Sequence, residues 1–534
     1  MLSPLLNYGC SSNCSIVNVQ SRCSSRCIHS CLDRLIPFTL KCALKLTFSF
    51  FFLLSGSVFS PLSLGPPSHT CGYYGALFWY EERIDRRRHT TRPLYNKCCK
   101  GGSVILPPYK PPPEPLHSLL TGVDRAKSAH FFENIRYYNS MFAFTSMGVN
   151  VIDSINDGRG PYVFKISGQL YHRIGSLLPK KDKRPEYAQL YIFDTKNELM
   201  NRLHVGTYTN RAFQPNDEIV AALMEMFDTH NPIVKLFRVA RDSLSRAGAS
   251  DDHYYIRLFG SPDKHGDIFS APVASEVVGL VVGDLGTSDI GRDLMVEDKA
   301  GNLRKVKEDH CKFMAMQYPI LFPYGEDGYH ENITYRQSRR SAGIKRKRAT
   351  VVEYYAYRLH DRGDDFNTPM RCKRGTQAYV IDAYCCKEES RLSHFRTKSF
   401  QQKYRTAPLK EIHDTIHKGI VQGSEAGQRI ILPSSYVGGP RYLYQNYLDC
   451  VALCRKYGCP DLFITFTSNP LWTEITQALA LIPGQHSSDR PDIVDHVFHM
   501  KLHLFIDDIT KNEFFGPITA GLIHYFYSNR SPFI

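Results

Sequence analysis

The sequence predicts an α+β protein of several domains, and three observations point to this class. The chain has 534 residues, which is enough for two to four domains. Its composition, 43% hydrophobic and 22% charged, is typical of a folded globular protein. Stretches with helical periodicity alternate with short β-branched and aromatic runs. The formal net charge of +14 favours a polyanionic partner such as nucleic acid.

The first seventy residues are rich in serine and cysteine and show no regular periodicity. An apolar, phenylalanine-rich run at residues 46–64 follows Lys41 and Lys45. It has about the length of a membrane helix or an uncleaved signal sequence, but serine and proline residues dilute it. We therefore expect an unstructured leader, or upstream sequence foreign to the protein, with membrane attachment through residues 46–64 as the alternative.

Cysteines are unevenly placed along the chain. Of the 16, six lie in the first fifty residues, three follow at Cys71, Cys98 and Cys99, and the next is Cys311. A secreted disulfide scaffold would be short and evenly bridged, so this pattern fits a reducing compartment with one metal cluster. The proline-rich residues 107–115 then predict a linker and a domain boundary.

Residues 116–348 combine expected strands and helices without any catalytic spacing. The strands are predicted at residues 162–166, 190–193 and 275–282. Asn216 is expected to cap a helix through Met226, with apolar residues on one face. A second amphipathic helix is expected over residues 231–242.

Two further features lie before residue 349. Residues 316–328 read as a loop punctuated by proline and glycine around an apolar plug. A basic stretch follows, and its last four residues are Lys345, Arg346, Lys347 and Arg348. It is typical of phosphate contact, of nuclear import or of a solvated surface loop, and these three interpretations stay open.

Helices are expected at residues 351–362 and 379–405, and a helix, a tight turn and a buried strand after residue 432. The apolar side chains at helical spacing are Leu443, Tyr447, Leu448, Val451 and Cys454. Gly458 can supply a left-handed C-cap to this helix. Residues 462–467 are β-branched and aromatic, as expected of a buried strand, and Asn469-Pro470 ends it with turn chemistry.

The order of identities in this last unit is more specific than its periodicity. They are Leu432-Pro433-Ser434-Ser435, Gly439-Pro440-Arg441-Tyr442, Gln445-Asn446-Tyr447, Pro460-Asp461, Phe466-Thr467, Asn469-Pro470 and Trp472. The segment resembles the opening of the replication-initiator (Rep) nuclease of Helitron rolling-circle transposons, the Helitron helicase-like N-terminal domain. The resemblance extends over roughly residues 71–523.

The resemblance implies a Rep-type (HUH) antiparallel sheet with flanking helices in the C-terminal part. It also implies a parent protein that nicks and rejoins single-stranded DNA through a tyrosine, with a divalent metal held by two histidines flanking one hydrophobic residue. Among the 21 histidines of this chain, no two are separated by a single residue, and no P-loop for ATP occurs. We therefore assign no catalytic residue and no ATP site.

In the family, a cluster of the form C-x-x-C-G-A is followed by a Cys-Cys pair, which together suit zinc. Here Tyr74 stands where the second cysteine of the knuckle should be. The three remaining thiols are those of Cys71, Cys98 and Cys99. The resemblance thus implies a degenerate zinc cluster, incomplete unless His69 or His89 completes it.

A second histidine pattern falls on a helix. His496, His499 and His503 lie on one arc of a helical wheel, and a histidine pair four residues apart can bind a metal. No acidic general base lies between His499 and His503, so we favour a solvated or capping role.

The resulting prediction has four parts: a leader at 1–70, a cysteine cluster and linker at 71–115, an α+β region at 116–348, and a Helitron helicase-like domain with an incomplete nuclease at 349–534. We expect a nuclear, catalytically inactive remnant that binds single-stranded DNA. The alternatives are an active nuclease and helicase whose reading frame continues past residue 534, or a membrane-tethered protein without enzymatic activity. The expected DNA contacts are Arg441, Tyr442, Thr467, Asn469, Lys345, Arg346, Lys347 and Arg348.

Overall fold

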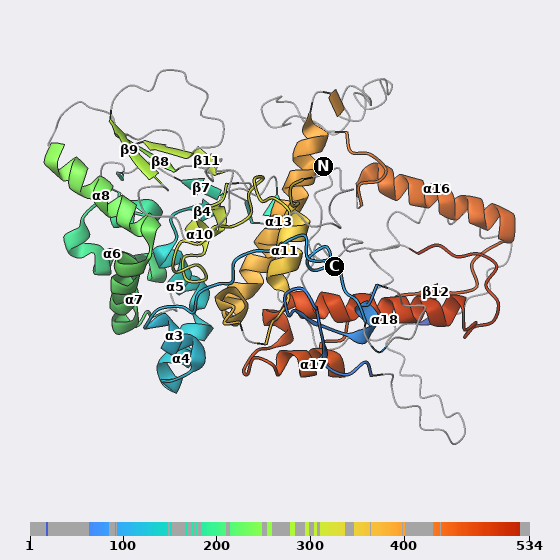
Figure 1. The fold of residues 1–534 in the computed structure, drawn as a ribbon. Coiled ribbons are helices and arrows are strands. Elements are labelled where there is room, and N and C mark those ends of the chain that lie inside the picture. The colour runs from blue at the N-terminus through green and yellow to red at the C-terminus, as the bar shows by residue number, and fades with distance from the viewer. Residues whose placement is uncertain are drawn as a thin grey trace.

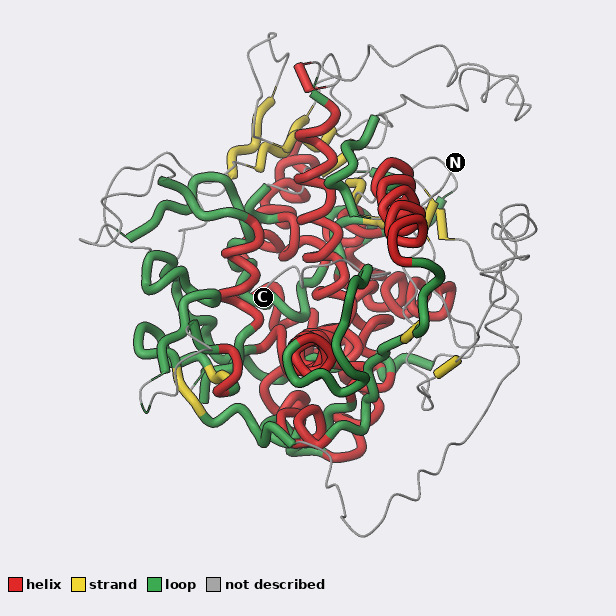
Figure 2. The backbone as a smooth tube through the Cα atoms, turned by 90° about the vertical axis from the view of Figure 1, so that its right-hand side faces the viewer, coloured by secondary structure: helices red, strands yellow, loops and turns green. Residues whose placement is uncertain are grey.

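The computed structural model shows a mostly helical protein with small antiparallel sheets (Figure 1). Figure 2 shows the helices gathered in the middle of the molecule and the strands at its margins. The structure describes residues 18–19 and 63–523, with gaps at 85–90, 92, 148–149, 152–165, 168–171, 175–177, 180–182, 210–213, 248–253, 259–277, 283–293, 298–303, 307–309, 337–346, 364, 398, 401–430 and 438. Within the described residues, no helix combines the length and apolar character needed to cross a bilayer, and residues 46–62 lie outside them.

The sheets are short, and none of those described has more than three strands. One sheet has the order β10-β8-β9 and another has the order β11-β7-β4. The strands of these two sheets are β4 (Ser146–Met147), β7 (His172–Ile174), β8 (Tyr254–Leu258), β9 (Val278–Val282), β10 (Leu294–Glu297) and β11 (Arg304–Val306). The remaining strands form pairs, namely β1 (Asn18–Val19) with β12 (Phe463–Ile464), β2 (His69–Thr70) with β3 (Leu77–Phe78), and β5 (Asn150–Val151) with β6 (Ile166–Ser167). The α+β prediction is therefore confirmed only in that helices and antiparallel strands occur together.

Helices dominate the region after the linker. They are α3 (Leu116–Thr121), α4 (Arg125–Glu133), α5 (Ile135–Phe142), α6 (Glu198–Thr209), α7 (Asp217–His230) and α8 (Pro232–Ala247). The predicted cap is confirmed, because the Asn216 side chain accepts a hydrogen bond from the Ile219 N–H at 3.1 Å. The second predicted helix is confirmed as α8.

The strand predicted at residues 190–193 is wrong. Residues Tyr187–Tyr191 form a 3-10 helix, η3, and a second short one, η4 (Thr195–Asn197), follows. Tertiary packing overrides the β-propensity, because Leu190 and Tyr191 are both buried and the Tyr191 hydroxyl donates to the Phe142 carbonyl at 2.6 Å. The strand expected at 275–282 is confirmed in part as β9, and of residues 162–166 only Ile166, in β6, is described.

The apolar plug predicted at residues 316–328 is confirmed. Helix α10 (Phe313–Gln317) leads into it, and Ile320, Leu321 and Phe322 are almost fully buried. Asn139 fixes the plug, because its amide donates to the Gln317 carbonyl at 2.8 Å. The plug belongs to one continuous core that collects side chains from residue 71 to residue 386.

The C-terminal region adds α11 (Val351–Leu359), α12 (Thr368–Arg371), α13 (Arg374–Arg396), α16 (Pro440–Tyr457), α17 (Thr473–Leu479), η5 (Ser487–Asp489) and α18 (Pro491–Thr510). Thr350 and Glu353 form a capping box at the start of α11. Helices α17 and α18 share a second, smaller core with Trp79, which comes from the 3-10 turn η2 region (Tyr80–Glu82).

Helix α16 confirms the predicted helix, but not its packing. It buries none of its residues, and its apolar positions Leu443, Tyr447 and Leu448 are all exposed. The buried strand expected after it is wrong, because β12 has two residues and Phe463 is 69% exposed. Figure 1 shows α16 extending along one margin of the molecule. No second layer of described residues covers this unit, so the Rep-type sheet is not seen.

A buried ion cluster joins α18 to the end of α11. The guanidinium of Arg490 is 1% exposed and contacts the carboxylates of Asp361 and Asp492, each at 2.7 Å. Removing one partner of a buried ion pair leaves an unpaired buried charge. Arg490 therefore fixes the position of α18 against the main core.

We expect Arg490→Ala to lower the free energy of unfolding by about 3–5 kcal/mol, because Asp361 and Asp492 lose their counter-charge. Urea unfolding followed by tryptophan fluorescence measures this, since Trp79 and Trp472 both lie at the second core. Lys127→Ala, which breaks an exposed ion pair with Glu218, is the control and should unfold like the wild type. A loss no larger than that of the control would contradict the role of Arg490.

Candidate metal centre and nucleic-acid surface

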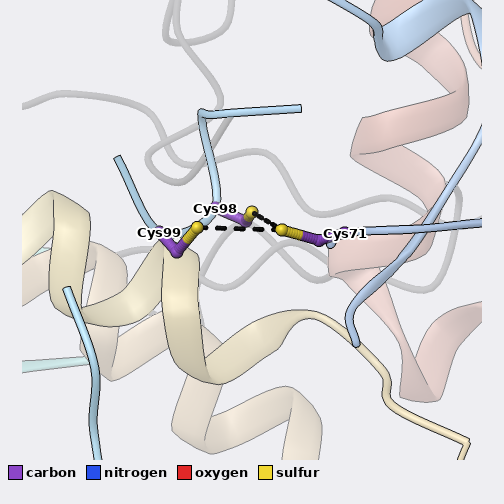
Figure 3. Close-up of side chains that lie close together, drawn as sticks. All are labelled: Cys71, Cys98 and Cys99. Atoms are coloured by element: carbon purple, nitrogen blue, oxygen red, sulfur yellow. Dashed lines mark hydrogen bonds between the residues drawn. The ribbon is translucent and has the colours of Figure 1, made fainter. Parts of the chain in front are cut away.

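Three cysteines meet at one buried point. Cys71 lies just after β2, and Cys98 and Cys99 lie in the turn before the proline-rich linker (Figure 3). The Sγ atom of Cys71 is 3.8 Å from that of Cys98 and 3.8 Å from that of Cys99. All three thiols are free and buried, and their sulfurs lie within 4.8 Å of one another. In the part of the chain that the structure describes, no other three His, Cys, Asp or Glu side chains bring ligand atoms as close.

The backbone around these sulfurs forms two tight turns. The Gly75 N–H donates to the Cys71 carbonyl at 2.9 Å, which closes the first turn. The Gly102 N–H donates to Cys99 Sγ at 3.2 Å, which directs the second turn at the sulfur. Gly102 has φ +82°, and a Cβ there would lie 2.6 Å from the Tyr73 ring, so only glycine fits this turn.

The hydrogen bonds among the thiols favour one thiolate. Hydrogen bonds from Cys98 and Cys99 lower the pKa of Cys71 well below its usual range, and N–H groups of the first turn lower it further. The same contact with Cys71 raises the pKa of Cys98 and of Cys99. A soft, negatively charged sulfur with two thiols beside it is the chemistry that zinc selects.

The distances fit a zinc ion. A tetrahedral site with Zn–S bonds of about 2.3 Å places its sulfurs about 3.8 Å apart, which is the spacing found here. The fourth position is not taken by His69, because neither nitrogen of its ring lies within 4.8 Å of all three sulfurs. His89 lies outside the described residues. Cys71, Cys98 and Cys99 could therefore hold three corners of a tetrahedron.

The predicted DNA contacts lie on three different segments. Arg441 and Tyr442 are half-buried at the start of α16. Thr467 and Asn469 are exposed on the segment after β12, where the Asn469 side chain accepts from the Leu471 N–H at 2.9 Å. The third segment carries the exposed Lys347 and Arg348, whereas Lys345 and Arg346 lie outside the described residues. The structure thus brings the three cysteines together, whereas the described DNA contacts lie on three separate segments of the chain.

Sequence reasoning missed the surface of α16, which carries aromatic and basic side chains together. Tyr444 and Tyr447 stack with ring centroids 6.3 Å apart, and Tyr444 is 63% exposed. Near the end of the helix, the Lys456 ammonium lies 4.9 Å from the Tyr457 ring centroid, and Arg455 is exposed. The helical spacing of Tyr447 predicts a core face, and the same spacing is the signal of this exposed surface.

This same region is recognised by comparison with known protein families. Residues 354–530 match the family described as Helitron helicase-like domain at N-terminus. The chain carries a Helitron helicase-like domain. The match begins inside α11 and includes α16 and α18, whereas Cys71, Cys98 and Cys99 lie before it. No curated protein matches the sequence.

The Helitron helicase-like domain contacts the cysteine-containing segment through buried histidines. His496 on α18 hydrogen-bonds Glu82 Oε1 through Nδ1 at 3.0 Å, and the ring of His360 lies 5.1 Å away. The solvated or capping role expected for His496 is wrong, because Glu82 supplies a buried partner from a distant part of the chain. His499 and His503 bring their Nε2 atoms to 3.1 Å of each other on the same helix.

Burial and charge shift the pKa values of this cluster in different directions. Burial, with the neighbouring His496 second, lowers the pKa of His360 to about 4. Burial alone would lower the pKa of His496, but the Glu82 carboxylate raises it above its usual value. Burial alone would raise the pKa of Glu82, but His496 holds it below its usual value. The His496–Glu82 attraction is thus lost as the pH rises through the raised pKa of His496, and as it falls through the lowered pKa of Glu82.

His360 should make the protein acid-sensitive. Its unfolded-state pKa is 6.5 and its folded-state pKa about 4, so stability should fall by about 3 kcal/mol as the pH falls from 6.5 to 4. His360→Asn keeps a side-chain N–H for the Ala356 carbonyl but cannot titrate, so it should lose this part of the slope. Urea midpoints at several pH values test this, with the exposed His230→Asn as the control. An unchanged slope in His360→Asn would refute the assignment.

Proposed function

We propose that this chain is a remnant of a Helitron rolling-circle transposon protein that binds single-stranded DNA without cutting it. The match of residues 354–530 to the Helitron helicase-like domain is the observation that carries this proposal. It supports transposon ancestry directly, and the net charge of +14 supports a nucleic-acid partner. A nuclear location follows from the proposed ligand.

The surface of α16 supports the choice of single-stranded DNA. Proteins that hold single strands combine basic side chains, which contact phosphates, with aromatic rings on which bases stack. Helix α16 carries four tyrosines, three basic residues and one acidic residue, Asp449, whose carboxylate accepts a hydrogen bond from Gln445 at 3.0 Å. Because none of its residues is buried, both kinds of side chain can reach a ligand.

The sequence lacks the histidine pair with which Rep-type nucleases cut DNA, and we therefore propose binding without cleavage. A Rep-type nuclease holds its divalent metal on two histidines separated by one residue. This sequence contains 21 histidines and no such pair. His499 and His503 lie four residues apart on helix α18. The family's two histidines instead lie two residues apart on a strand and are followed by a tyrosine, so the helical pair does not replace them.

Zinc is proposed as a structural ion held by Cys71, Cys98 and Cys99. When bound, it would cross-link the turn after β2 to the turn before the linker, and so stabilise the segment that packs against the Helitron helicase-like domain. The 3.8 Å sulfur spacing and the backbone N–H donor to Cys99 Sγ support this role.

Arg441 is the side chain we expect to contact a phosphate. Arg441→Ala should weaken binding to a fluorescent oligothymidine and reduce the slope of log K against log salt by about 0.7, the value for one phosphate contact on a single strand. Fluorescence anisotropy at several salt concentrations measures both. Lys127→Ala, on α4 outside the Helitron helicase-like domain, is the matched control for charge. An unchanged slope in Arg441→Ala would remove this contact, and cleavage of the oligonucleotide with magnesium would overturn the proposal of binding alone.

The stacking surface gives a separate prediction. Tyr444→Ala with Tyr447→Ala should weaken binding of the same oligonucleotide by about 1–3 kcal/mol per stacked base, while the salt slope stays as in the wild type. The reason is that the rings carry no charge. Equal binding by the double variant would show that α16 is not the stacking surface.

The zinc site predicts a metal stoichiometry. The purified wild type, kept reduced, should retain about one zinc per chain, and Cys98→Ser should retain none, because two sulfurs do not hold zinc tightly. Metal analysis after desalting measures this. Cys459→Ser, at an exposed cysteine, is the control and should keep its zinc. A wild type without zinc would refute the site.

A further inference from the structure

We propose that the hydroxyl oxygen of Tyr74 is the fourth ligand of this metal centre. The proposal rests on the zinc site proposed above and adds a ligand that is not a thiol. The resulting centre would be held by the Sγ atoms of Cys71, Cys98 and Cys99 and by Tyr74 Oη. The class of metal is a divalent, thiolate-preferring ion, of which zinc is the ordinary case.

The first argument is the position of Tyr74 in its turn. A C-x-x-C knuckle supplies two ligands from one turn, because residues three apart face the same side. Tyr74 is three residues after Cys71, and the turn is closed by the Gly75 N–H bonded to the Cys71 carbonyl at 2.9 Å. Gly75 has φ +77°, the left-handed conformation that favours glycine after such a turn. The backbone of the knuckle is therefore kept, with tyrosine at the position of its second ligand.

The second argument is the state of the Tyr74 hydroxyl. The oxygen is buried, and it makes no hydrogen bond within the described part of the chain. Burying a hydroxyl without a partner is unfavourable, so such an atom usually has a ligand or an ordered water. Burial, with the neighbouring Cys98 thiol second, raises the pKa of Tyr74 well above its usual value, so the hydroxyl would lose its proton only to a bound metal. The unsatisfied oxygen thus lies beside the one cluster of soft ligands in the described residues.

The third argument is that the ring is held in place. It stacks on Tyr357 with centroids 4.3 Å apart, and the Arg362 guanidinium lies 4.8 Å from its centroid. Arg362 is itself fixed by an ion pair with Asp365 at 2.9 Å. A ring packed between these groups keeps its hydroxyl at one place, as a metal ligand must be kept.

The other described candidates for the fourth ligand do not reach the cluster. No His, Asp or Glu atom of the described residues joins the three sulfurs within 4.8 Å. His69 hydrogen-bonds Ser68 at 3.3 Å, and its ring lies against Tyr80. The choice that an experiment must settle is therefore between Tyr74, a water molecule and His89.

The test is Tyr74→Phe in the full chain, which keeps the ring on Tyr357 and removes only the oxygen. Competition against a chromophoric chelator should show zinc affinity reduced at least about tenfold, the lower end of what even an outer-shell partner costs. The cobalt-substituted protein should keep its thiolate-to-metal absorption and lose the contribution of the phenolate. Tyr109→Phe removes another buried hydroxyl without a partner and should change neither measurement.

The proposal is overturned if Tyr74→Phe matches the wild type in affinity and spectrum; water or His89 then fills the position. A wild type without zinc would instead refute the three-cysteine site itself.

Discussion

The packing of residues 76–82 between two cores is the contact on which the rest of the structure depends. Phe78 belongs to the main core and Trp79 to the small core of α17 and α18. The Leu77 N–H donates to the Asp361 carbonyl at 2.9 Å, and Glu82 hydrogen-bonds His496 at 3.0 Å. One short segment, β3 followed by η2, therefore packs against the Helitron helicase-like domain near its start at Asp361 and again at α17 and α18. Cys71 precedes this segment and Cys98 and Cys99 follow it in the chain, so a metal held by all three would link the two flanks of this junction between the cores.

This junction explains why local patterns predicted some elements well and others poorly. The cap at Asn216 and the plug around Leu321 were predictable, because capping and apolar burial are encoded within a few residues. The strand expected at 190–193 was not, since Tyr191 bonds a carbonyl 49 residues earlier in the chain. The pairing of Glu82 with His496 spans 414 residues, and no local pattern contains such information. The cysteine cluster was found because the family motif, and not the spacing, joined residues 71 and 98.

Helix α16 shows that periodicity can predict a helix correctly and its burial wrongly. The spacing of its apolar residues predicted a core face, and the helix formed as expected, with Gly458 bonded to the Cys454 carbonyl at 3.0 Å. Burial, however, depends on a second layer, and the described residues supply none. The same tyrosines can serve as a packing surface or as a stacking surface, since an aromatic ring buries apolar area in either case. The pattern therefore predicts which face of the helix is apolar, but not what packs or binds on that face.

The two proposed sites have different physical bases. The metal centre is buried, preorganised by two backbone turns, and set by sulfur spacing, so its chemistry is local. The proposed DNA surface is exposed and does not hold a bound strand in one fixed position. Its affinity for DNA would therefore come from charge and base stacking summed along the helix. The described contacts between the cysteine segment and the Helitron helicase-like domain include Trp79 in the small core, the His496–Glu82 pair, and the Leu77 N–H bonded to the Asp361 carbonyl. Loss of metal would therefore act on DNA binding through the stability of the junction, and not through the residues of α16.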